Sequence, residues 1–193
     1  GYARDARSWL LTHAVAVPRP GEAPPHESYY YLELLRRAGW IEKLPALKWI
    51  QLKVPAQATE RAEEILERAG VPGAPRVLRV AVAPGAAYGT AKCWPVERYA
   101  ALADRLIAEF GADVILFGSA SEREVTGKIA AAMKRTAVQL AGETSIADLP
   151  ALLASCDLFI GNDSGAMHVA AAVGLPVVAV FGPTDPKGTA PMT

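Results

Sequence analysis

Between residues 77 and 181, short apolar runs alternate with segments of helical spacing, and this alternation constrains the fold more than any other feature. The apolar runs predict strands over residues 77–83, 113–117, 137–140, 157–160 and 176–181. The segments between them predict helices over residues 96–110, 122–133, 146–154 and 164–173. Strands that are apolar throughout are typical of a parallel sheet with helices on both faces. The sequence therefore predicts an α/β, Rossmann-like fold.

The first 75 residues are less regular. They predict an extended run over residues 9–17 and helices over residues 27–39 and 57–69, before a Pro/Gly-rich stretch at residues 71–75. We place a domain boundary there. The chain starts without methionine and stops in a loop, so both ends look like cuts through something larger. We expect residues 1–75 to be the remnant of a preceding α/β domain plus linker, and residues 76–193 to be a nucleotide-binding domain incomplete at its end.

Composition excludes several function classes. Lys+Arg and Asp+Glu both number 20, which gives no global charge bias toward nucleic acid or an anionic membrane surface. The two cysteines, Cys93 and Cys156, are far apart and lack CxxC spacing, which argues against a disulfide framework or a zinc site. The sequence holds neither an apolar run of the ~18 residues that a membrane span needs nor a signal-like start. We expect a cytoplasmic protein.

Polar loops follow the predicted strands. They cover residues 84–95, 118–121, 141–145, 161–165 and 182–189, and they are rich in Gly, Ser, Thr, Asn or Asp. In an open parallel sheet, ligands bind outside the carboxyl ends of the strands. These loops therefore hold the candidate site.

The corner at residues 162–165 joins the fourth predicted strand to a helix. Asp163 or Ser164 is the expected N-cap, and Gly165 lets a ligand approach the backbone. The unpaired N–H groups of a first helical turn favour an anion such as a phosphate, and His168 lies one turn further on. Taken alone, the stretch equally fits a capped helix with a polar loop and a hydrogen-bonded histidine.

The loop at residues 84–95 carries Lys92, yet it lacks the GxxxxGK[ST] spacing of a Walker motif, and no GxGxxG follows the first strand. ATP hydrolysis and hydride transfer are therefore not favoured. Lys92 and Thr90 suit a diphosphate leaving group, whereas a lone loop lysine is otherwise a solvated charge. The carboxylates of Glu122 and Glu124 suit ribose hydroxyls, although acidic residues are favoured in a first helical turn anyway.

Five motifs in order resemble those of the glycosyltransferases that add heptose to the inner core of lipopolysaccharide, glycosyltransferase family 9, and most closely its heptosyltransferase II branch. They are Pro84-Gly85-Ala86 with Gly89-x-Ala91-Lys92-x-Trp94-Pro95, Leu116-Phe117-Gly118-Ser119, Leu140-Ala141-Gly142-Glu143-Thr144, Asn162-Asp163-Ser164-Gly165-x-Met167-His168-Val169-Ala170-Ala171-Ala172 and Phe181-Gly182-Pro183-Thr184. The likeness spans residues 80–185, and residues 1–75 match more loosely.

The resemblance implies a GT-B enzyme with two Rossmann-like domains facing across a cleft, the second of which holds most of the sugar nucleotide. It implies ADP-heptose as donor substrate, no cofactor and a heptosylated Kdo-lipid A core as acceptor. It also implies a cytoplasmic enzyme that meets its acceptor at the surface of the inner membrane. Transfer would invert the anomeric centre without a metal held by a DxD motif, and this sequence has no DxD.

The resemblance also implies roles for individual residues. Lys92, assisted by Thr90, would bind the donor phosphates, and Ser164 and Gly165 would hold the diphosphate. Asp163 would bind the sugar or orient the donor, so Lys92 and Asp163 are the catalytic candidates.

Four further residues complete the implied donor site. Glu143, Thr144 and Met167 would lie near the nucleoside, and His168 would line the site. The general base of the family is an aspartate near the start of the first domain, and this chain begins past that point. Two alternatives stay open: another GT-B enzyme, such as a UDP-sugar transferase or an epimerase, and a donor-binding module inactive as this fragment.

Overall fold

The computed structural model describes residues 1–47, 49–71, 73, 77–86 and 90–192, with the side chain of Thr90 outside the description. The chain divides into two compact units. Unit 1 comprises Gly1–Lys48 and Asp185–Ala190, and unit 2 comprises Trp49–Thr184 and Pro191–Thr193. Most of the predicted linker lies outside the described residues. The assignment of residues 1–75 to a preceding domain of a longer protein stays a prediction.

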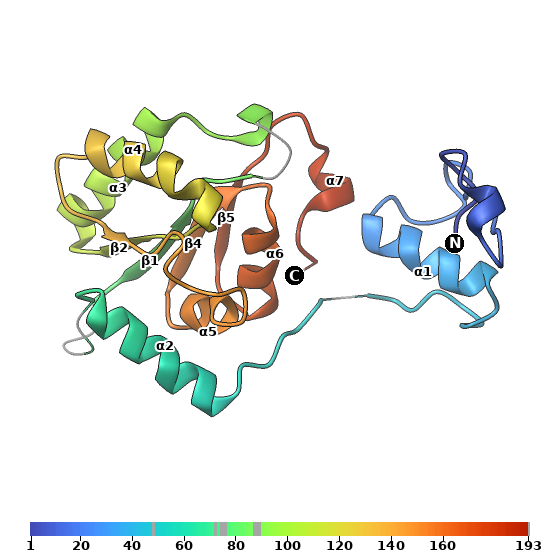
Figure 1. The fold of residues 1–193 in the computed structure, drawn as a ribbon, viewed down its shortest axis with the longest axis horizontal. Helices are drawn as coiled ribbons and strands as arrows, with labels where there is room; N and C mark the ends of the chain where they lie inside the picture. The colour runs from blue at the N-terminus through green and yellow to red at the C-terminus, as the bar shows by residue number, and fades with distance from the viewer. Residues whose placement is uncertain (48, 72, 74–76, 87–89, 193) are drawn as a thin grey trace. The chain divides into compact units, whose positions relative to one another are not determined.

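Unit 2 is built on a five-stranded sheet in the order β3-β2-β1-β4-β5, and all its strand pairs are parallel (Figure 1). The strands are β1 (Arg79–Ala83), β2 (Asp113–Leu116), β3 (Val138–Gln139), β4 (Leu158–Asn162) and β5 (Val177–Val180). Each of the five predicted strands is present, and the predicted parallel α/β fold is confirmed.

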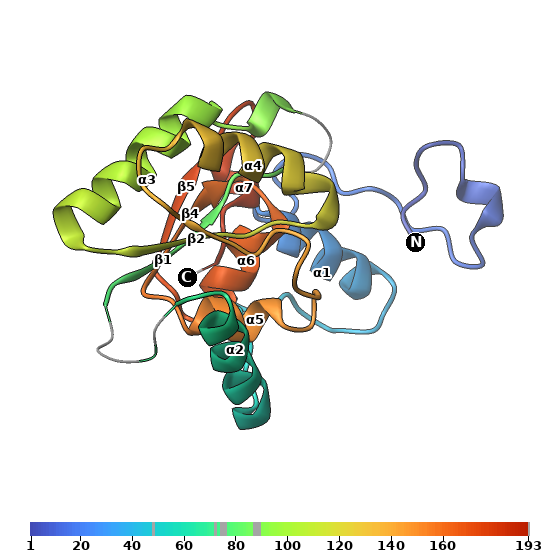
Figure 2. The ribbon, with the colours of Figure 1, turned by 60° about the vertical axis from the view of Figure 1, so that its left-hand side comes forward.

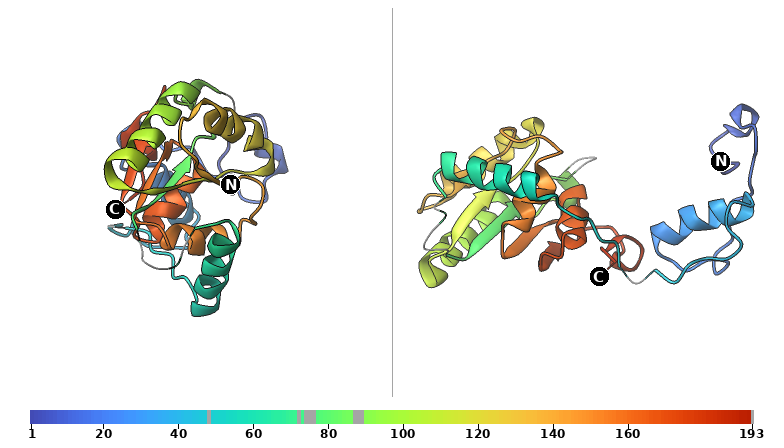
Figure 3. Two further views of the ribbon diagram at one scale, coloured as in Figure 1. Left: turned by 90° about the vertical axis from the view of Figure 1, so that its left-hand side faces the viewer. Right: turned by 90° about the horizontal axis from the view of Figure 1, so that it is seen from below.

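Helices cover both faces of this sheet (Figures 2 and 3). One face packs against α3 (Val96–Phe110) and α4 (Arg123–Ala132), the other against α2 (Ala56–Arg68), α5 (Leu149–Ala154) and α6 (Gly165–Ala172). Strand β1 is buried along its whole length because both of its faces are covered. Val80 and Val82 pack in the core with α3 and α4, and Ala81 and Ala83 pack in the core with α2, α5 and α6. The period of two in a strand therefore accounts for the unbroken apolar runs.

The strand order reverses between β1 and β4, which creates the topological switch point where ligands of such sheets bind. Ala83 pairs with Gly161 across these strands. A Cβ on Gly161 would lie 2.8 Å from the Ala83 carbonyl oxygen and 2.8 Å from the Phe159 ring. Glycine at this position thus permits the close approach of the two strand ends.

Unit 1 contains the 3-10 turn η1 (Ser8–Leu10), α1 (Glu27–Arg37) and the short α7 (Pro186–Thr189). The extended run predicted from residue 9 instead begins as this turn, with the Trp9 side chain exposed, and contributes only an isolated bridge between Tyr2 and Val15. A buried carboxylate, Glu33, was not expected in α1. It accepts hydrogen bonds from Arg36 and Arg37 of the same helix.

Candidate functional site

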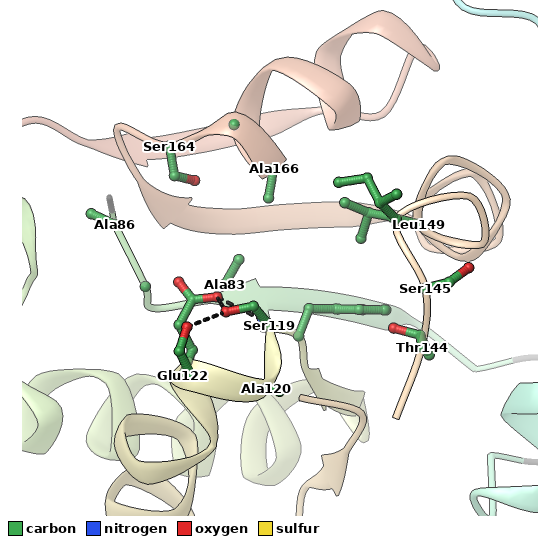
Figure 4. Close-up of a pocket in the computed structure, with 16 residues that line it drawn as sticks. Ala83, Ala86, Ser119, Ala120, Glu122, Thr144, Ser145, Leu149, Ser164 and Ala166 are labelled. Carbon is green, nitrogen blue, oxygen red and sulfur yellow. Dashed lines mark hydrogen bonds between the residues drawn. The ribbon is translucent and has the colours of Figure 1, made fainter. Parts of the chain in front are cut away.

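A cavity of about 530 Å³ opens in unit 2 where β1, β2 and β4 end. Its walls come from the loops that follow β1 and β2, the segment that leads into α5, and the first turn of α6. Figure 4 shows Ser164 and Ala166 on one side, Ser119 and Glu122 on the opposite side, and Thr144 and Leu149 at one end. The cavity lies at the predicted edge of the sheet.

The first turn of α6 supplies a donor-rich wall. Ser164 occupies the N-cap with extended backbone angles (φ −147°, ψ 167°), but its side chain does not cap the helix. Its buried Oγ has no hydrogen-bond partner among the described residues. A Cβ on Gly165 would meet nothing within 4 Å, so the backbone there is open to close approach. An unpaired buried hydroxyl beside free helical N–H groups is suited to an oxyanion ligand.

Glu122 forms the facing wall. Its Oε2 accepts hydrogen bonds from the backbone N–H of Ser119 (2.6 Å) and from the Ser119 hydroxyl (2.7 Å). Its Oε1 occupies the space where a Cβ of Gly85 would stand, 1.5 Å from that ideal position. Ser119 is thus the N-cap of the 3-10 turn η3 (Ala120–Glu122), which leads into α4. Glu124 points elsewhere and pairs with Lys128, so only Glu122 lines the cavity.

The end of the cavity with Thr144 and Leu149 lies beside the segment that leads into α5, and the lining also includes the apolar side chains of Phe117, Ile146 and Ala166. Helix α5 begins at Leu149, three residues later than predicted, because Pro150 has no N–H to donate to the carbonyl of Ile146. Ser145 and Asp148 exchange hydrogen bonds in the preceding turn. Ile146 therefore stays outside the helix and is 86% exposed at the cavity. This end is suited to a flat, weakly polar ring.

Asp163 and Lys92 form an ion pair with Nζ 2.6 Å from Oδ2. The Thr184 hydroxyl donates to the same oxygen, also at 2.6 Å. Burial alone would raise the pKa of Asp163, but the hydrogen bonds from Lys92 and Thr184 outweigh burial and lower it below the ordinary value. The charge of His168 adds a smaller lowering.

Asn162, the last residue of β4, was not recognised from the sequence. Its fully buried amide donates to the Pro84 carbonyl and accepts from the Trp94 N–H and the Tyr99 hydroxyl. The only signal in the sequence was a polar residue that ends an apolar run.

The structure brings together some predicted site residues and separates others. Thr144, Ser164 and Gly165 line the cavity, whereas the Lys92–Asp163 pair adjoins it through the peptide bond to Ser164. Glu143, Met167 and His168 are, like Lys92 and Asp163, absent from the lining.

Those three differ in their surroundings. Glu143 is exposed and pairs with Arg123 at 2.6 Å, Met167 is fully buried in the core, and His168 is exposed on α6. The side chain of Thr90 lies outside the described residues, although its backbone begins a 3-10 turn, η2 (Thr90–Lys92).

Within the described ranges, no cluster of three His, Cys, Asp or Glu side chains could hold a metal ion. No helix among the same residues has both the length and the apolar character to cross a bilayer.

Two solved structures show how similar this fold is to that of known proteins. Escherichia coli ADP-heptose lipopolysaccharide heptosyltransferase II superposes with a TM-score of 0.80 at 33% identity, over 100% of this chain and 58% of that one. A family 9 glycosyltransferase of Veillonella parvula gives a TM-score of 0.78 at 23% identity, over 95% of this chain and 51% of that one. The second likeness is informative for the fold alone.

Sequence similarity to curated heptosyltransferases agrees with this structural similarity. Lipooligosaccharide heptosyltransferase 2 of Haemophilus influenzae is 37% identical over 156 residues, 79% of this chain and 44% of that protein. Lipopolysaccharide heptosyltransferase 2 of Escherichia coli is 46% identical over 114 residues, 57% of this chain and 32% of that protein. The chain thus spans less than half the length of these curated relatives in the matched regions. The profile described as glycosyltransferase family 9 (heptosyltransferase) matches residues 1–193. The chain belongs to glycosyltransferase family 9, the heptosyltransferase family.

Proposed function

We propose that this chain is the donor-binding part of an inverting glycosyltransferase that transfers heptose from ADP-heptose to the inner core of lipopolysaccharide. Family membership and the names of the relatives support this reaction. The observation that carries it is the cavity at the switch point, with the unpartnered Ser164 hydroxyl on one wall and the Glu122 carboxylate on the other. Its volume lies in the range of small-molecule sites.

The cavity's polarity suggests how a nucleoside diphosphate lies in it. The diphosphate takes the first turn of α6, where Ser164 and Gly165 donate hydrogen bonds, with Lys92 nearby. The ribose hydroxyls donate to Glu122, which is suited to accept them. The base takes the apolar end beside Ile146, and Thr144 lines that end.

The proposed reaction is a displacement at the anomeric carbon. The acceptor hydroxyl attacks from the face opposite the nucleotide, the new C–O bond forms, and the bond to the phosphate oxygen breaks. ADP leaves with the electron pair, and Lys92 and the helix dipole of α6 stabilise its growing charge. Asp163 orients Lys92 and the sugar. The acceptor's proton goes to a general base that the family resemblance places in the preceding domain.

The partners follow from the same proposal. The acceptor is the Kdo-lipid A core at the surface of the inner membrane, and the enzyme is cytoplasmic. Acceptor contacts come largely from the preceding domain, of which residues 1–75 would be the remnant.

Isothermal titration of the 193-residue chain with ADP, ADP-heptose and UDP tests the proposal. We expect ADP to bind and UDP to bind at least tenfold more weakly, since adenine would bury more apolar surface at this end of the cavity than the smaller uracil ring. Equal or stronger UDP binding would contradict the heptose donor and favour a UDP-sugar enzyme. The absence of ADP binding by a folded chain would contradict the whole assignment of the site.

A further inference from the structure

The loop that carries Lys92 is attached to the sheet at both ends by one buried side chain. Asn162 donates to the carbonyl of Pro84, where the loop leaves β1, and accepts from the N–H of Trp94, where the loop reaches α3. Lys92 stands two residues before Trp94. The same amide therefore fixes the entry and the exit of this loop.

Tyr99 completes the attachment from α3. Its hydroxyl donates to Asn162 Oδ1 at 2.8 Å, and its ring meets the Trp94 ring edge-on at 5.1 Å between centroids. Tyr99 is only 1% exposed, and burial raises its pKa well above the ordinary value, so the hydroxyl stays a donor. The Oδ1 atom accepts from two donors and Nδ2 faces a carbonyl, which agrees with the assigned orientation of the amide.

A third support lies behind the turn. A Cβ on Gly182 would stand 2.8 Å from the carbonyl oxygen of Ala91 and 3.3 Å from the Cα of Lys92. The backbone after β5 therefore packs directly against η2. The backbone around Lys92 is thus held by Asn162 on one side and by the Gly182 backbone on the other. Asp163 then holds the ammonium group of Lys92.

We infer that Asn162, supported by Tyr99, is a positioning residue for the donor diphosphate: it acts through the loop to present Lys92 without touching the ligand. This inference deepens the proposed function and rests on it. Asn162 thus holds the backbone of the loop, and the adjacent Asp163 holds the ammonium group of Lys92.

A double-mutant cycle in the 193-residue chain tests the inference, with ADP affinity measured by isothermal titration. We expect Asn162→Ala to weaken ADP binding about tenfold and Tyr99→Phe about threefold when Lys92 is present. In the Lys92→Ala background each change should alter the affinity by less than about twofold, because coupled residues are not additive. Tyr99→Phe serves if Asn162→Ala does not fold.

Tyr2→Phe is the matched control, because Tyr2 is also buried and its hydroxyl donates one hydrogen bond, to the Tyr30 carbonyl in unit 1. It should leave ADP affinity unchanged. Two results would overturn the positioning role, provided that Lys92→Ala by itself weakens ADP binding. In the first, each of Asn162→Ala and Tyr99→Phe lowers ADP affinity as much without Lys92 as with it; in the second, neither lowers it at all. An unchanged affinity in Lys92→Ala alone would instead overturn the proposed function, and the positioning role with it.

Discussion

Lys92 and Asp163 are 71 positions apart in sequence, yet Lys92 Nζ lies 2.6 Å from Asp163 Oδ2. The Asp163 side chain is only 6% exposed and that of Lys92 is 28% exposed. The cation proposed to meet a diphosphate is therefore already paired with a carboxylate in this structure.

Replacing the lysine should weaken nucleotide binding. Lys92→Ala removes a charge-assisted contact, and such contacts contribute about 1.5–3 kcal/mol, so we expect ADP affinity to fall about tenfold or more. Lys128→Ala is the matched control, because Lys128 is an exposed lysine paired with Glu124 on α4. Titration calorimetry of both variants measures the difference. An unchanged ADP affinity in Lys92→Ala would reduce this lysine to a surface charge.

The ion pair should also contribute to stability in a pH-dependent way. The pKa of Asp163 is lowered in the folded chain, so its contribution is present above about pH 4 and is lost as the pH falls through the lowered pKa. Asp163→Asn should cost about 1–3 kcal/mol near pH 7. Urea unfolding of both proteins at several pH values should show this gap closing as the pH falls below about 4. A gap that stays constant over that range would show that the pair adds nothing to stability.

Gly85 should be needed for the shape of the cavity. A methyl group at residue 85 would occupy the position of Glu122 Oε1, so Gly85→Ala must displace that carboxylate. Because the carboxylate is the end of a flexible side chain, we expect a loss of stability of only about 1 kcal/mol, together with a five- to tenfold loss of ADP affinity.

Gly127→Ala is the control for this change. Gly127 lies inside α4 and its Cβ would meet nothing within 4 Å. The substitution should stabilise the chain by about 0.5–1 kcal/mol and leave ADP affinity unchanged. Wild-type affinity in Gly85→Ala would remove Glu122 from the proposed ribose contact.

In unit 1, the buried carboxylate of α1 should be a stability determinant. Hydrogen bonds from Arg36 and then Arg37 outweigh burial and lower the pKa of Glu33 to about 2. Its contribution is thus present at neutral pH and disappears as the pH falls from about 4 to about 2. Glu33→Gln should cost about 1–3 kcal/mol at pH 7.

The exposed Glu27 of the same helix provides the control, and Glu27→Gln should cost at most about 1 kcal/mol. Urea unfolding followed by tryptophan fluorescence measures both variants, since Trp9 and Trp40 lie in unit 1. Equal losses in the two variants would show that burial of the Glu33 carboxylate has no special effect.

The order of strands and helices could be predicted because it depends on local pattern. Each strand of unit 2 is an apolar run, and each long helix has an apolar face, so neither prediction required knowledge of tertiary contacts. Helix starts were less accurate. Pro150 lacks the N–H that would bond to Ile146, so α5 begins at Leu149. A 3-10 turn, η3 (Ala120–Glu122) with Ser119 as its N-cap, precedes α4.

The buried polar groups could not be predicted. The burial of Asn162 depends on partners that are distant in the sequence, such as Tyr99. Glu33 has its partners Arg36 and Arg37 in its own helix, but their spacing does not reveal that the carboxylate is buried. The choice among acidic residues had the same difficulty. Glu143, one of the residues predicted near the nucleoside, pairs with Arg123 at the surface, and its role stays a prediction, whereas Glu122 lines the cavity.

The Glu122 carboxylate accepts hydrogen bonds from Ser119, which closes a helical turn, and it also lines the cavity. Ser119 and a bound ribose would therefore compete for this carboxylate. A ribose that draws this carboxylate away would release the Ser119 amide to solvent. Hydrogen exchange at that amide should therefore quicken when nucleotide binds, while amides of the α6 first turn become protected. Binding at this site would loosen one turn of the protein as it tightens another.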